Sequence, residues 1–275
     1  MKITAQEVNQ LRKRTGAGMM DCKKALVETE GDMEKAIDVL RKKGQKVAAK
    51  RADRDAGEGL VLSKVSDDKS YAALVMVNCE TDFVAINADF IAFAKSIIDV
   101  AVTNKVKNID ELKAAQLGNR TVDESILDQT GVIGEKIELG GFDCVAADSA
   151  YAYIHPGNRI ATIACFNKKG DNVEAAGKDI VMQIAAMNPI ALNKEGVSDE
   201  MIKREIEIGM DQARQEGKPE AMLEKIAMGK LNKFYKENTL INQAFIKDTK
   251  KNVSQYLQEV ENGLTVVDFK RLALS

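Results

Sequence analysis

The sequence predicts an α+β protein in which a small helical domain precedes a core of strands and helices. Helical periodicity dominates the first 45 residues, strand-like segments then appear in two separate regions, and a polar helical pattern returns near residue 200. Each strand region is followed by a helix with an apolar stripe, which is typical of sheets covered on one face by helices. A chain of 275 residues is long enough for about two domains and for a core that needs no disulfides.

Residues 1–45 predict a domain of three short helices. Thr4 and Glu7 have the spacing of a capping box, in which each side chain accepts a hydrogen bond from the other residue's backbone N–H. Glycine just after the last turn ends many helices because it adopts left-handed backbone angles without strain. We expect the breaks at Gly16, Gly31 and Gly44.

The core is predicted to contain one unit twice. Strand character in Leu60–Val65 and Tyr71–Cys79 precedes a helix with Asn87 as its N-cap. A second set of strands, at 136–147, 150–155 and 159–166, again precedes a helix. The recurrence of strand, strand and helix indicates an internal duplication of an α+β unit with antiparallel sheets.

We therefore expect the following domain organisation along the chain. The segments are the helical domain (1–45), a linker (46–57), the first core subdomain (58–135), the second core subdomain (136–197 and 260–275), a helical hairpin (198–236) and a short C-terminal module (237–259). In the hairpin, Ser198 is the N-cap, Gly217 the break and Pro219 the first helical position of the second arm. The hairpin could pack against its own chain, a partner or a second copy, so a homodimer through it is one expectation.

Composition excludes several classes of catalytic and metal site. The chain has one histidine, His155, so zinc sites that need two histidines are impossible and a Ser-His-Asp triad has only this residue to use. Its four cysteines are far apart and form no CxxC pattern. Gly16–Asp21 begins like a dinucleotide-binding loop, but it ends in Asp21 and no strand precedes it. We expect no catalytic residue, no metal site and no cofactor bound by this chain.

Charge and hydropathy predict a cytoplasmic protein. The net charge is −2 at pH 7, so the whole molecule has no bias toward nucleic acid. No secretory signal is visible, and the longest apolar runs, such as Tyr71–Val77, are too short to cross a bilayer. One basic segment, Arg41–Arg54, carries seven Lys and Arg residues and one Asp. It predicts either a solvated linker or an RNA contact.

Three exposed or core-capping positions are candidates for contact with a partner. Phe83 lies in the connection Glu80–Val84 between a strand and a helix, where it either folds back onto the local core or stays exposed as a wedge. The pair Met19-Met20 either caps the helical core or forms an adaptable contact surface. His155 lies in a tight turn between strands, and is either a surface residue or a polar contact at the same sheet edge as the connection after Cys79.

Five stretches resemble signature motifs of the elongation factor Ts family, in order and over nearly the whole chain. They are Leu11–Leu26 (LRKRTGAGMMDCKKAL), Val77–Ala85 (VNCETDFVA), Ile154–Ile160 (IHPGNRI), Gly229–Phe234 and Phe245–Asp248. The resemblance implies a ubiquitin-associated-like N-terminal domain, a duplicated core, a coiled-coil excursion and a C-terminal module. It also implies a guanine nucleotide exchange factor of translation elongation that is not an enzyme.

The resemblance further implies a partner and contact residues. The partner would be elongation factor Tu, to which GDP, GTP and magnesium would belong. In the Thr81-Asp82-Phe83-Val84 loop, Asp82 and Phe83 match the pair that pushes into the GTPase domain beside its magnesium, and His155 matches a contact to the same region. Leu11, Arg12, Met19 and Met20 match the N-terminal contact region.

Two other functions remain open from the residues alone. An RNA-binding module would use the basic segment Arg41–Arg54, and its binding would weaken steeply with salt. A small enzyme would use Asp82 and His155 as acid and base, and its activity would need no protein partner.

Overall fold

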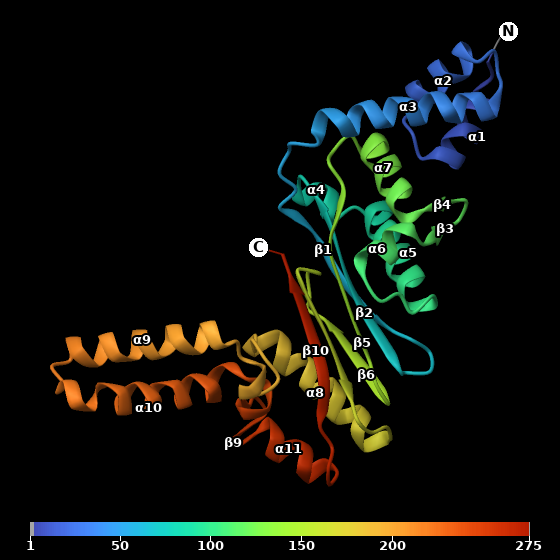
Figure 1. Ribbon diagram of the computed structural model, residues 1–275. Helices are drawn as coiled ribbons and strands as arrows, with labels where there is room; N and C mark the ends of the chain where they lie inside the picture. Colours follow the sequence, from blue (N-terminus) through green and yellow to red (C-terminus); the bar gives the residue numbers. More distant parts are fainter. Residues whose placement is uncertain (1–2, 275) are drawn as a thin grey trace.

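The computed structural model describes residues 3–274, which form an elongated molecule of three parts (Figure 1). Helices lie at the N-terminal end, two antiparallel sheets with their covering helices form the middle, and a helical hairpin projects from the core. The predicted α+β class, with N-terminal helices followed by antiparallel sheets, is confirmed.

The N-terminal part is built from α1 (Ala5–Thr15), α2 (Met19–Glu28) and α3 (Met33–Arg51). The predicted capping box is present, because Thr4 Oγ1 accepts the Glu7 N–H at 3.2 Å and the Glu7 carboxylate accepts the Thr4 N–H at 2.7 Å. Gly16 ends α1 with a φ of 69°, as expected. The small apolar core between the three helices contains Val8, Leu11, Ala17, Cys22, Ala25, Leu26 and Ala36.

The expectation that Gly44 ends the third helix is wrong. Helix α3 continues to Arg51, and Gly44 is buried where α3 crosses α7 (Val122–Ile133). A Cβ atom added to Gly131 of α7 would lie under 3.0 Å from the Gly44 backbone. The two glycines therefore allow the helices to approach closely, and Gly44 serves interhelical packing instead of helix termination.

The first sheet has the strand order β1-β2-β5 and is antiparallel throughout. Its strands are β1 (Glu58–Val65), β2 (Tyr71–Cys79) and β5 (Glu138–Ala146). The short helix α4 (Asp82–Ala85) follows β2, and α5 (Ala88–Thr103), α6 (Ile109–Ala114) and α7 cover one face of the sheet (Figure 1). A two-stranded hairpin, β3 (Gln116–Leu117) with β4 (Arg120–Thr121), lies between α6 and α7.

The second sheet has the order β10-β7-β6 and is also antiparallel. Its strands are β6 (Ser149–Ile154), β7 (Ile160–Phe166) and β10 (Val266–Ala273). Helices α8 (Asp171–Met187) and α11 (Val253–Val260) pack on its outer face. Strand, strand and helix thus recur in the order that the sequence predicts.

The sheet boundary differs from the predicted subdomain boundary. We placed residues 136–197 in the second subdomain, but β5 pairs with β2 and so completes the first sheet. The physical reason is that Ile137 and Leu139 face the apolar core under α5 and α7, so burial holds this strand against β2. The second sheet is completed instead by β10 from the end of the chain.

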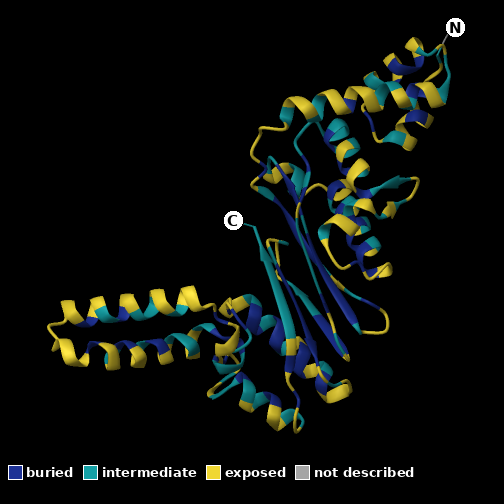
Figure 2. Cartoon of the chain, viewed as in Figure 1, coloured by how far each residue is buried: buried dark blue, intermediate teal, exposed yellow. Residues whose placement is uncertain are grey.

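The two sheets pack face to face, which gives four layers: helices, sheet, sheet and helices. Strand alternation supplies both faces, because Leu60 and Leu62 point toward α5 while Val61 points toward the other sheet. Figure 2 shows the buried residues concentrated along these strands. The layer between the sheets contains Val61, Ala72, Leu74, Val145, Ala150, Ala161, Ile163 and Cys165.

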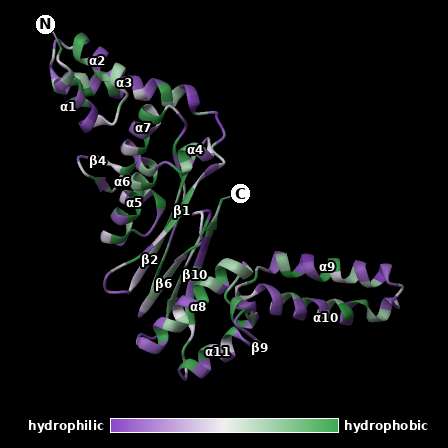
Figure 3. Cartoon of the chain, turned by 180° about the vertical axis from the view of Figure 1, so that it is seen from behind, coloured by the Kyte–Doolittle hydropathy of each residue, from purple (hydrophilic) through white to green (hydrophobic). Residues whose placement is uncertain are grey.

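The helical hairpin consists of α9 (Asp199–Gln215) and α10 (Glu220–Asn238). Ser198 caps α9 as predicted, and Gly217 turns the chain with a φ of 73°. Pro219 is the N-cap of α10, one position earlier than expected. The arms touch where Gly209 faces Ala227, and both carry hydrophilic and hydrophobic residues along their length (Figure 3).

Short elements connect the hairpin to the core. They are the 3₁₀ helices η1 (Lys194–Gly196) and η2 (Leu240–Asn242) and the strands β8 (Ala244–Phe245) and β9 (Asp248–Asn252). Phe245 of β8 enters the core beneath the second sheet, together with Val253 and Leu257 of α11. Within residues 3–274, no helix combines the length and the apolar character needed to cross a membrane.

Replacing Gly131 with Ala tests the close crossing of α3 and α7. The added methyl group collides with the Gly44 backbone, so we expect Gly131→Ala to lower the free energy of unfolding by about 1–3 kcal/mol. Gly229→Ala is the matched control, because this exposed helical glycine has nothing within 4 Å of its Cβ position. The control should raise stability by about 1 kcal/mol. Urea denaturation of both variants measures the difference, and equal midpoints would contradict the crossing.

Candidate functional site around the Thr81–Val84 turn

The connection after β2 is an ordered turn of helix. Thr81 is the N-cap of α4, and its hydroxyl accepts the Val84 N–H at 3.4 Å. The Ile86 N–H donates to the Asp82 carbonyl at 3.1 Å, which closes the helical turn. Because the backbone is bonded within the turn, the side chains of Asp82 and Phe83 take defined directions.

Phe83 does not fold back onto the local core. Its side chain is 80% exposed, and that of Ile86 is 75% exposed, the highest values among large hydrophobic residues that the structure describes. Val84 and Ala85, in contrast, pack against the core beneath α5. Burying a phenylalanine side chain stabilises a fold by about 1.5–3 kcal/mol, so leaving Phe83 in water forgoes this stabilisation. An exposed apolar pair on an ordered turn is typical of a contact surface.

Ile86 was not among the candidates from the sequence. A hydrophobic residue directly before an N-cap usually packs onto the helix that follows, and Ile86 precedes the N-cap Asn87 of α5. The sequence signal therefore pointed to packing, whereas the structure places Ile86 on the surface, three residues after Phe83.

The carboxylates of Glu135 and Glu80 attach this turn to neighbouring segments of the fold. Glu135, in the connection between α7 and β5, accepts the Thr81 N–H at 3.0 Å and the Thr81 hydroxyl at 2.8 Å. Glu80 accepts the Lys136 backbone N–H at 2.6 Å and bonds from the Arg51 guanidinium at 2.7 and 2.8 Å. The bond from Lys136, followed by that from Arg51, lowers the pKa of Glu80, so its carboxylate is charged at neutral pH.

The turn that contains His155 lies at the same end of the strands as the Thr81–Val84 turn. The two positions are linked through β1, whose Glu58 pairs in register with Cys79 at the end of β2. Arg159, in the turn after His155, forms an ion pair with Glu58 at 2.6 Å. The His155 side chain is exposed, and its Nδ1 lies 3.0 Å from the Tyr153 hydroxyl.

Two of the predicted N-terminal contact residues present large apolar side chains to solvent. Met19 and Met20, at the start of α2, are 58% and 61% exposed, so they do not cap the helical core. Arg12 is also exposed. Leu11 is a correction, because its side chain has no exposed surface and packs between the three helices. Its regular spacing with Val8 was the sequence signal for a core position.

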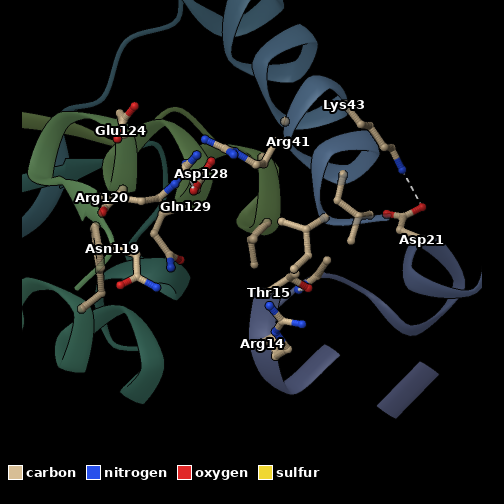
Figure 4. A pocket seen from close by; sticks show the side chains of 18 of the residues that line it. Arg14, Thr15, Asp21, Arg41, Lys43, Asn119, Arg120, Glu124, Asp128 and Gln129 are labelled. Carbon is tan, nitrogen blue, oxygen red and sulfur yellow. Dashed lines mark hydrogen bonds and ion pairs between the residues drawn. The ribbon is translucent and has the colours of Figure 1, made fainter. Parts of the chain in front are cut away.

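A cavity of about 750 Å³ separates the N-terminal helices from α7 and the β3–β4 hairpin (Figure 4). Charged side chains from both parts line it, and each part pairs its own charges: Lys43 with Asp21 at 2.5 Å in the N-terminal helices, and Arg120 of β4 with Asp128 of α7. Burial raises the pKa of Asp128. None of the Thr81–Val84 residues reaches this cavity, so we treat it as the junction between two parts of the fold.

The basic segment Arg41–Arg54 lies mainly on the second half of α3. Three of its cations form ion pairs with carboxylates of the same chain: Arg41 with Asp38, Lys43 with Asp21, and Arg51 with Glu80. Intramolecular pairing reduces the positive charge available to a phosphate backbone. The segment is therefore mainly helical, and three of its seven cations already have a carboxylate partner.

No group of three or more His, Cys, Asp or Glu side chains within residues 3–274 has the geometry to hold a metal ion. Asp82 and His155, the pair considered for acid–base chemistry, both have exposed side chains. No hydrogen bond or ion pair joining them is found among the described residues, so the geometry gives no support to that alternative.

Comparison with known proteins decides the family. The family model described as Elongation factor TS matches residues 80–275, which is more than half of the chain. The chain belongs to the elongation factor Ts family. The Elongation factor Ts of Christiangramia forsetii is 54% identical over 273 residues, and that of Amoebophilus asiaticus is 50% identical over 273 residues. Each alignment covers 99% of both chains, and therefore includes the N-terminal helices that lie outside the family model.

In this member of the elongation factor Ts family, the reactivity of the Cys79 thiol tests how tightly the end of β2 is packed. Burial, with the nearby Glu135 carboxylate, raises the pKa of Cys79 to about 12. We therefore expect iodoacetamide at pH 8 to modify Cys79 more than about a hundredfold more slowly in the folded protein than in urea. Cys144, which is partly exposed, should react faster than Cys79 in the folded protein. Mass spectrometry follows both cysteines, and equal rates would show that the end of β2 is accessible.

Proposed function

We propose that this chain is a guanine nucleotide exchange factor of translation elongation that acts on elongation factor Tu. The observation that carries the proposal is the exposed Phe83 on an ordered turn, in a chain of the elongation factor Ts family. The Thr81-Asp82-Phe83-Val84 turn inserts into the GTPase beside its magnesium and phosphate site and promotes release of GDP. GDP, GTP and magnesium all belong to the partner.

The exposed apolar surface supplies the driving force for binding. Phe83 and Ile86 remain in water in the free protein, so a partner that covers them gains the free energy of removing that surface from water. Asp82, adjacent to Phe83 and also exposed, brings a negative charge to the same place. Near a magnesium site, this charge competes with phosphate oxygens for the ion.

Exchange follows from differential binding and needs no bond chemistry in this chain. The factor binds the nucleotide-free GTPase more tightly than the GDP-bound form. Thermodynamic linkage then requires GDP to bind the complex more weakly by the same factor. Each side chain of the turn therefore acts by contact, and none acts as an acid, base or nucleophile.

Further contacts spread over the molecule stabilise the nucleotide-free complex. Arg12, Met19 and Met20 on the N-terminal helices form one surface, and His155 at the sheet edge adds a contact near the turn. Methionine side chains adapt their shape to a partner at low cost. Leu11 takes part only indirectly, because it holds α1 in place from inside the helical core.

The hairpin is proposed as the place where a second copy of the chain could bind. Its arms present Met201, Ile208, Met222 and Met228 with exposed side chains. Sedimentation of the full chain tests the homodimer independently of exchange activity.

Phe83→Ala tests the exchange function and the role of the turn together. The measurement is release of fluorescent GDP from purified elongation factor Tu. We expect wild-type protein in catalytic amounts to accelerate release, and the variant to lose about 2 kcal/mol of transition-state stabilisation, or roughly thirtyfold in kcat/KM. Because Phe83 is exposed, the stability of the variant should change by less than about 0.5 kcal/mol.

Val267→Ala is the matched control for Phe83→Ala. Val267 is also an exposed apolar residue, but it lies near the start of β10, at the opposite end of the sheet from the His155 turn. Its exchange activity should equal that of the wild type. Full activity of Phe83→Ala would refute the wedge, and absence of acceleration by the wild type would refute exchange altogether and redirect attention to RNA binding through Arg41–Arg54.

A further inference from the structure

Thr81 is the point at which the exposed turn is attached to the rest of the fold. Its N–H and its hydroxyl both donate to the carboxylate of Glu135, at 3.0 and 2.8 Å, and the two bonds end on different oxygens. The two residues are 54 positions apart in the sequence. Hydrogen bonds to an ionised acceptor are shorter and stronger than neutral ones.

The bond to Glu135 also fixes the direction of the Thr81 hydroxyl. A carboxylate only accepts, so the hydroxyl proton points toward Glu135 and its lone pairs are left to face the Val84 N–H at 3.4 Å. The cap of α4 therefore depends on a carboxylate outside α4. A glutamine at position 135 would replace one accepting oxygen with an NH₂ donor and would break one of the two bonds.

Glu80, the residue before Thr81, attaches the turn to two further segments. It accepts bonds from Arg51, the last residue of α3, and from the backbone N–H of Lys136, directly after Glu135. The Glu80 side chain is only 15% exposed. Glu80 and Glu135 thus tie together α3, the Thr81–Val84 turn and the connection between α7 and β5.

We propose that Glu135, assisted by Glu80, is a positioning residue that holds the Thr81–Val84 turn in its binding geometry before a partner arrives. The inference rests on the proposed exchange function and adds a residue that no motif singled out. Ordering a contact loop in advance reduces the entropy lost on association, so a preorganised Phe83 binds with a higher rate and affinity. Because Arg51 is the last residue of α3, the same cluster also joins that helix to the turn.

Glu135→Gln tests the proposal in two independent measurements. In the GDP-release assay with elongation factor Tu, we expect kcat/KM to fall about tenfold, the usual effect of losing a hydrogen bond to a charged group. In the free protein, backbone amides of Val84, Ala85 and Ile86 should exchange hydrogen about tenfold faster, because the capped turn opens more often.

Thr81 variants separate the hydroxyl bond from general damage to the fold. Thr81→Ser keeps the hydroxyl, so in the free protein the amides of Val84, Ala85 and Ile86 should exchange hydrogen at wild-type rates. Thr81→Val removes the hydroxyl, and its effects on kcat/KM and on amide exchange should match those of Glu135→Gln. The double variant should lose little more kcat/KM than either single variant. Glu138→Gln is the matched control, since it removes a carboxylate three residues away that pairs with the Lys136 ammonium at 3.0 Å and does not touch the turn.

The outcomes distinguish this inference from the exchange function. Wild-type acceleration with Glu135→Gln unchanged in both kcat/KM and amide exchange would overturn the positioning role and leave the exchange function intact. No acceleration by the wild type would overturn the exchange function, and amide exchange in the free protein would then still decide whether Glu135 holds the turn. Equal losses in Glu135→Gln and Glu138→Gln would also overturn the proposal, because they would indicate a general effect of charge.

Discussion

The face-to-face packing of the two sheets is the constraint on which the rest of the molecule depends. Ala72 and Leu74 of the first sheet meet Ala161 and Ile163 of the second in an apolar layer that water does not reach. With this layer as one face, each sheet must bury its other face under helices, so α5 and α8 lie on opposite sides of the molecule. The packing also aligns the strands, so the turns after β2 and β6 lie at the same end of the two sheets.

At this end of the sheets, the turn that carries the exposed Phe83 is nevertheless ordered. The turn at Phe83 makes few apolar contacts of its own, and its order comes from polar bonds to Glu135 and from the packing of Val84. Polar bonds at the base leave the apolar tip free for a partner. Thr81 bonds inward to Glu135 while Phe83 is exposed to solvent, so the proposed contact residue stands on an ordered base.

The N-terminal helices are attached to this core by a close backbone contact between α3 and α7 and by a side-chain ion pair at the end of α3. Gly44 and Gly131 let α3 cross α7 closely, and Arg51 carries the end of the same helix to Glu80 beside the turn. The cavity lined by Arg14, Arg120 and Asp128 lies between the same two parts. The continuous helix α3 thus contacts the core both near its middle and at its end.

The sequence by itself determined the local elements, because their signals are local. The capping box at Thr4, the cap at Asn87 and the strands at Leu60–Val65 and Tyr71–Cys79 all appear as expected, and the signature motifs pointed to the family. Only the tertiary structure decided which strand completes each sheet, why Gly44 lies inside a helix, and whether Phe83 is exposed. Each of these depends on residues far away in the chain, such as Gly131 for Gly44 and Glu135 for Thr81, and no local pattern contains that information.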